Sequence, residues 1–179
     1  MSKRLELERD LRARKSGIAL DLQHKQEARY DEEDKMGVPQ RIVDWIHAAL
    51  KDDGIKPLTQ NRNWRDIQFW LRDGVVICTL INKLLTAKGL PTIKFKKNAH
   101  THFIALENIT QFNHGAKAYG VPDNDLFDPI DLYESHKGPF LNPIKCLNRL
   151  GQIANSNGFE PQYEVVKPTL DSDLVGMLE

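Results

Sequence analysis

The feature that most constrains this chain is the run IQFWLRDGVVICTLINKLL at residues 67–85, which is apolar on nearly every side. A helix with no polar face must lie at the centre of a packed domain, because no side of it can face water. The β-branched residues 75–77 would also suit a strand, but the length of the run and its Leu-rich flanks favour a helix. We therefore predict one long buried central helix, preceded by a capping-box-like start at Asn63 and Asp66.

Three further helices follow from apolar residues at helical spacing. Their predicted ranges are 38–50, 103–119 and 143–156. In the last of them Asn142 is the expected N-cap and Pro143 the first helical residue. Trp45, Trp70, Cys78 and Cys146 lie within apolar stripes and are expected in the core. Four helices, no alternating strand pattern and no internal repeat predict a compact all-α domain over residues 37–158.

Two charged or polar segments flank this domain. Residues 1–36 hold 9 basic and 9 acidic residues and few apolar ones. Such a segment is helix-prone but poor in core material, so we expect a charged helical arm that is loosely docked or exposed to solvent. Gly17 is expected to interrupt the arm, and Gly37 with Pro39 to end it. Residues 159–179 form a C-terminal tail.

The formal net charge is zero, with 25 basic and 25 acidic residues, but the charges are unevenly distributed. Residues 37–118 hold 12 Lys or Arg against 6 Asp or Glu, and residues 119–179 hold 4 against 10. The densest basic cluster is Lys88, Lys94, Lys96 and Lys97. This cluster either engages an acidic protein surface, anionic lipid or nucleic acid, or pairs with the acidic half of its own chain. The neutral total argues against nucleic acid as a partner.

The motifs that carry catalytic or metal chemistry are missing. The sequence has no nucleophile elbow, Walker loop, dinucleotide-binding glycine motif or zinc-protease motif, so we expect no enzyme activity and no cofactor. His100, His102 and His114 lack partners at metal-ligand spacing. Residues 123–134 have the length of a calcium loop but carry Phe127 and Pro129 where ligands belong, so no metal is expected.

The chain also has no apolar run long enough to cross a bilayer, no secretory signal and only two cysteines. These features predict a protein of the reducing cytoplasm.

Several motifs in order resemble the calponin homology domain. The run FWLRDGVVICTLINKL is similar to the signature of that domain, and FIALENITQF, AKAYGVPDNDLF and DLYE follow it in the expected order. The segment SGIALDLQHKQEARYDEE at 16–33 resembles the helix that precedes the domain in calponins and transgelins. The likeness covers residues 16–158 and is to the single-domain calponin/transgelin type. Its architectural signature residues here are Trp45, Trp70, Asp73, Gly74, Leu106, Asn108, Asp131 and Tyr133.

The resemblance implies a non-catalytic module of actin-associated proteins, monomeric, cytoplasmic or cytoskeletal and often found in muscle. The expected partner is filamentous actin, bound weakly through Lys88, Lys94, Lys96 and Lys97, with Arg41 and Lys117 as further candidates. A signalling scaffold that binds kinases, or a microtubule-binding module, is the alternative. Two departures from the family pattern bear on this choice: the segment 134–151 is about two residues longer than in relatives, and residues 159–179 contain no calponin-type repeat.

Overall fold

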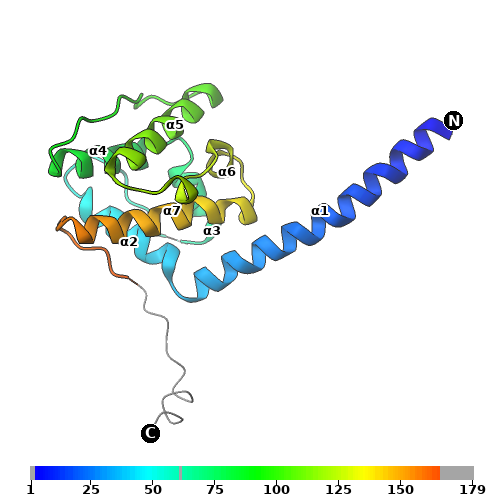
Figure 1. Ribbon diagram of the computed structural model, residues 1–179, viewed down its shortest axis with the longest axis horizontal. Helices are drawn as coiled ribbons and strands as arrows, with labels where there is room; N and C mark the ends of the chain where they lie inside the picture. Colours follow the sequence, from blue (N-terminus) through cyan, green and yellow to red (C-terminus); the bar gives the residue numbers. More distant parts are fainter. Residues whose placement is uncertain (1–2, 61, 166–179) are drawn as a thin grey trace, which may run out of the picture.

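The computed structural model describes residues 3–60 and 62–165, with side chains from residue 17 onward. Over these residues the fold is all-α, as predicted, and contains no strand. The elements are α1 (Lys3–Lys35), α2 (Val38–Ala49), α3 (Trp64–Leu71), α4 (Val75–Ala87), α5 (His102–Tyr119), the 3₁₀ turn η1 (Asp123–Asp125), α6 (Pro129–Tyr133) and α7 (Lys137–Ser156). In Figure 1, α2 to α7 form one packed body and α1 extends away from it.

One side of α4 is buried in the core, where Ile77, Leu80 and Ile81 have no exposed surface. The apolar run therefore supplies core residues, as predicted, but α4 is not enclosed on all sides, because Thr79, Asn82 and Lys83 line a cleft. α5 packs along α4, and α7 contacts α1, α2, α3 and α6. The two cysteines are fully buried, and burial raises the pKa of the Cys146 thiol to about 12.

The single central helix predicted over 67–85 is wrong, because the chain turns between α3 and α4. Gly74 has a φ of 79° and is the N-cap position of α4. A left-handed residue cannot continue an α-helix, and glycine adopts this conformation without steric cost. The predicted helix start at Asn63 is confirmed. The Asn63 side chain caps α3 by accepting a hydrogen bond from the Asp66 N–H at 3.0 Å.

The predicted start of the last helix is also wrong. α7 begins at Lys137, and Pro143 lies inside it rather than in its first turn. Asn142 does not cap the helix, since its amide donates to the Asp131 carboxylate at 3.0 Å. The predicted ends are confirmed: α5 ends at Tyr119 with Gly120 as its C-cap, and α7 ends at Ser156 with Asn157 as its C-cap.

Three large aromatic residues within the predicted apolar helices 67–85 and 103–119 are not buried. The side chains of Phe69 and Phe103 are 71% and 74% exposed. Trp70 is half-buried, and its indole N–H donates to the Lys56 carbonyl at 2.8 Å. Trp45 is buried, as predicted, and its indole N–H donates to the Pro161 carbonyl at 3.0 Å. A helical period places these residues correctly along their helices but does not say which neighbour covers them.

The core also includes residues from both flanking segments. α1 runs through Gly17 without interruption, so the predicted break there is wrong. Near the end of α1, Tyr30 is buried and stacks against Phe140 of α7 with ring centroids 5.8 Å apart. Beyond α7, Tyr163 is buried and its hydroxyl donates to the Asn148 side chain at 2.7 Å.

Candidate partner-binding site

The lysine loop, defined here as residues 93–97 between α4 and α5, is held in place by two asparagine side chains. Asn82 of α4 accepts from the Ile93 N–H at 2.8 Å and donates to the Ile93 carbonyl at 3.0 Å. Asn108 of α5 does the same for Lys96, at 2.9 and 2.8 Å. Each clamp satisfies one amide and one carbonyl of a segment with no secondary structure. The backbone that carries the lysines is therefore fixed to both helices.

The Asn108 clamp also depends on the turn before α4. The Asn108 amide donates to the Asp73 carbonyl at 3.1 Å, and the Asp73 carboxylate accepts from the Val75 N–H at 3.0 Å. A Cβ atom on Gly74 would lie 2.8 Å from the Asn108 Cβ, so only glycine allows this approach. Asp73, Gly74 and Asn108 thus form one structural unit that positions the lysine loop.

The six candidate cations divide into two groups. Lys94, Lys96 and Lys97 are exposed, and over the described part of the chain no carboxylate lies within 4 Å of their amines. The other three interact within the molecule: Arg41 pairs with Glu164 at 3.2 Å, Lys117 pairs with Asp123 at 3.1 Å, and the Lys88 amine lies 3.3 Å from the Tyr119 carbonyl. Arg41 and Lys117 therefore pair with carboxylates of their own chain, whereas Lys94, Lys96 and Lys97 form an open basic surface.

A second surface lies where α3, α5 and α6 meet, and we call it the aromatic patch: Phe69 and His102, which are exposed, and Arg72 and Tyr133, which are half-buried. The Arg72 guanidinium lies 4.5 Å from the centroid of the Tyr133 ring and 5.9 Å from that of Phe69. His102 meets Tyr133 edge-on at 4.5 Å. Exposed aromatic rings and arginine are the residue types that dominate binding energy at protein interfaces. Residues 99–101 connect this patch to the lysine loop along the chain and line its small pocket.

The comparison with known families identifies the fold. The model of the calponin homology (CH) domain matches residues 37–155. The chain belongs to this family. CH domains are binding modules that serve actin binding and signalling. The match confirms the resemblance to the calponin homology domain over residues 37–155.

In this CH domain the remaining signature residues support the framework. Leu106 is half-buried on α5, and the Tyr133 ring meets His102 edge-on. Partial burial raises the pKa of the Asp131 carboxyl, while its hydrogen bond from Asn142 opposes that shift. These residues join α5, α6 and α7 at the side of the domain that presents the patch.

Two further observations concern metal binding and membrane spans. Within the described ranges no three His, Cys, Asp or Glu side chains come close enough together to hold a metal ion. No helix in the same ranges is both long and apolar enough to span a bilayer.

Some residues of this site could not be identified from the sequence. Asn82 lies in an apolar helix with no motif to mark it. Phe69 is exposed because α3 buries Ile67, Gln68 and Leu71, which leaves Phe69 on the opposite face. The Asp73–Gly74 pair is a turn signal that marks the end of α3, but it does not indicate which face of α3 is exposed.

Proposed function

We propose that this protein is an actin-associated cytoskeletal protein of the calponin/transgelin type, acting in the cytoplasm to organise actin filaments or regulate contraction. Its CH domain binds the filament through the lysine loop, with the aromatic patch as an adjoining contact. The observation that carries the proposal is a group of three exposed lysines, Lys94, Lys96 and Lys97, on a backbone clamped by Asn82 and Asn108. Among the residues that the structure describes, no carboxylate lies within 4 Å of their amines.

A rigid loop favours binding because little conformational entropy is lost when the filament is met. Three like charges close together also attract an acidic surface from a distance, which raises the association rate at low salt. One domain with few charge pairs gives a weak and salt-sensitive interaction. Arg41 and Lys117 contribute less, because each already pairs with a carboxylate of the same chain.

The test is co-sedimentation of the full chain with actin filaments at increasing salt concentration. The variant K94E/K96E/K97E is expected to bind at least about tenfold more weakly at low salt, because three exposed pairs at about 0.5 kcal/mol each amount to roughly 1.5 kcal/mol. The control variant K35E/K51E/K145E makes the same change in net charge at exposed lysines of other segments. It is expected to pellet like the unmodified protein.

Three outcomes contradict the proposal. Equal weakening by both variants indicates a general charge effect rather than a docking site. Unchanged pelleting of K94E/K96E/K97E removes the lysine loop from binding. If the unmodified chain does not pellet with actin at any salt concentration, the actin function is wrong; binding to a defined kinase would then support the scaffold alternative, and pelleting with microtubules the other one.

A further inference from the structure

A cleft of about 1000 Å³ runs along the outward face of α4, next to the lysine loop. Its floor is formed by α4 residues from Val75 to Ala87, which span about 18 Å at the rise of an α-helix. One wall is the turn at 53–55, and the other contains Phe95 and Lys97 of the lysine loop. A space of this size is large enough to receive side chains of a bound partner.

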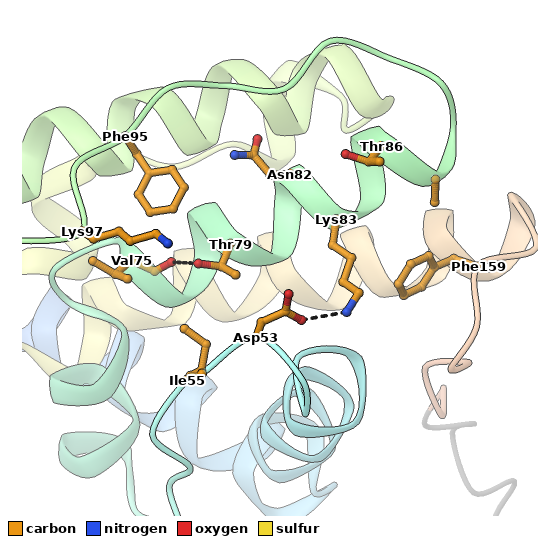
Figure 2. A pocket seen from close by; sticks show the side chains of 12 residues that line it. Asp53, Ile55, Val75, Thr79, Asn82, Lys83, Thr86, Phe95, Lys97 and Phe159 are labelled. Carbon is orange, nitrogen blue, oxygen red and sulfur yellow. Dashed lines mark hydrogen bonds and ion pairs between the residues drawn. The ribbon is translucent and has the colours of Figure 1, made fainter.

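The lysines of the loop differ in their relation to this cleft. Figure 2 shows the Lys97 side chain reaching over Val75 towards Thr79, inside the cleft. Lys94 and Lys96 do not line the cleft. The lysine loop therefore presents one amine inside the cleft and two outside it.

Lys97 is the cation of the cleft that has no partner charge. Lys83 pairs with Asp53 at 2.7 Å, so these two charges offset each other. Over the described part of the chain no carboxylate lies within 4 Å of the Lys97 amine. Ile55 and Phe95 give the two walls an apolar surface. The complementary chemistry is an apolar side chain with a carboxylate beside it.

We propose that the α4 cleft receives a segment of the actin filament that has this chemistry, with its apolar side chain between Ile55 and Phe95 and its carboxylate paired with Lys97. This inference rests on the proposed function and separates two parts of the contact. Lys94 and Lys96 attract the filament from the exposed side of the loop, and salt screens that attraction. The cleft removes apolar surface from water, and salt does not screen that contribution.

The experiment fills the cleft without changing any lysine. Thr79→Phe places a ring on its floor beneath Lys97. Thr110→Phe is the matched control on α5: both threonines are half-buried, and each hydroxyl donates to the carbonyl four residues earlier in its own helix. Thr110 does not line the cleft. Circular dichroism and urea unfolding establish that each variant is folded before binding is measured.

A second pair of variants changes only exposed alanines near the ends of helices. Ala87→Trp fills the cleft from the last residue of α4, and Ala48→Trp adds the same side chain to α2, outside the cleft. This pair keeps the test valid if Thr79→Phe fails to fold.

The readout is co-sedimentation of the full chain with actin filaments at low and at high salt. Thr79→Phe and Ala87→Trp are expected to bind about tenfold more weakly at both salt concentrations, because the partner's apolar side chain stays in water. Thr110→Phe and Ala48→Trp are expected to bind like the unmodified chain. Lys97→Met is expected to weaken binding at both salt concentrations, whereas Lys94→Met weakens it only at low salt.

The possible failures are distinguishable. If the unmodified chain pellets with actin and the cleft-filling variants pellet equally well, the cleft inference is wrong and the proposed function stands. Equal weakening by the control variants also overturns the inference, because the effect is then not specific to the cleft. Identical salt dependence of Lys97→Met and Lys94→Met shows that no carboxylate enters the cleft. If the unmodified chain does not pellet at any salt concentration, the proposed function is wrong and the inference fails with it.

Discussion

Replacing Gly74 by alanine tests whether the contact between the α3–α4 turn and α5 holds the domain together. Gly74 has a φ of 79°, which costs an L-residue about 1–2 kcal/mol. The new Cβ would also lie 2.8 Å from the Asn108 Cβ and 3.2 Å from the Ile109 nitrogen. Neither atom is the end of a flexible side chain, so α4 and α5 must separate slightly.

Gly89 provides a matched control for this substitution. Its φ is 75°, nearly the same as that of Gly74, but a Cβ there would meet no atom within 4 Å. Gly89→Ala therefore reports the backbone strain alone, about 1 kcal/mol after the smaller entropy of the unfolded chain is counted. Gly74→Ala adds the cost of overpacking, about 1–3 kcal/mol, for a total of roughly 2–4 kcal/mol. The difference between the two variants isolates the steric contact.

The assay is equilibrium unfolding in urea, followed by tryptophan fluorescence and circular dichroism, with the m-value checked for constancy. Hydrogen exchange of the Lys96 amide adds a local readout, because that N–H donates to Asn108 and is expected to exchange faster in Gly74→Ala than in Gly89→Ala. Equal loss of stability in the two variants, with unchanged protection at Lys96, would refute the close-contact argument.

Two further predictions concern pH and thiol reactivity. The His47 Nε2 atom accepts a hydrogen bond from the Leu58 N–H at 2.9 Å. Partial burial lowers the pKa of His47, and the nearby Arg62 charge lowers it further, while Asp44 opposes the shift. The unfolded state therefore binds a proton at His47 more readily than the folded state does. The free energy of unfolding is expected to fall as the pH drops from about 7 to 5 and through the lowered pKa. Urea titrations in which the His47→Gln variant shows the same dependence of unfolding free energy on pH would contradict this. Cys78 and Cys146 are buried and burial raises the pKa of both thiols, so neither is expected to react with a thiol reagent until the domain unfolds in urea, and rapid native-state labelling of either one would be inconsistent with the core.

How much of the fold could be predicted depended on whether the signal was local. The start of α2, the cap at Asn63 and the ends of α5 and α7 follow from residues adjacent to each boundary. The break at Gly74 was missed because the apolar pattern continues on both sides of it. The start of α7 was missed because Pro143 lies within the helix, where a proline is normally unfavourable.

The candidate binding site shows the same division between local and distant information. The cluster of Lys94, Lys96 and Lys97 is evident from the sequence, but the anchoring of its backbone comes from Asn82 and Asn108 on two different helices. The aromatic patch depends on contacts among α3, α5 and α6, which no short motif encodes. Side-chain exposure of this kind requires the packed structure.

The distribution of charge explains how a neutral protein can present a basic surface of the kind proposed here for docking. Arg41 and Lys117 pair with carboxylates of the acidic half, which removes their charges from the external field at short range. The lysine loop is left as a local excess of positive charge, and its field extends only about 8–10 Å at physiological salt. On the proposed function, a partner must therefore come close before it is attracted, so the clamps that fix the loop, and not the net charge of the chain, determine which surface it meets.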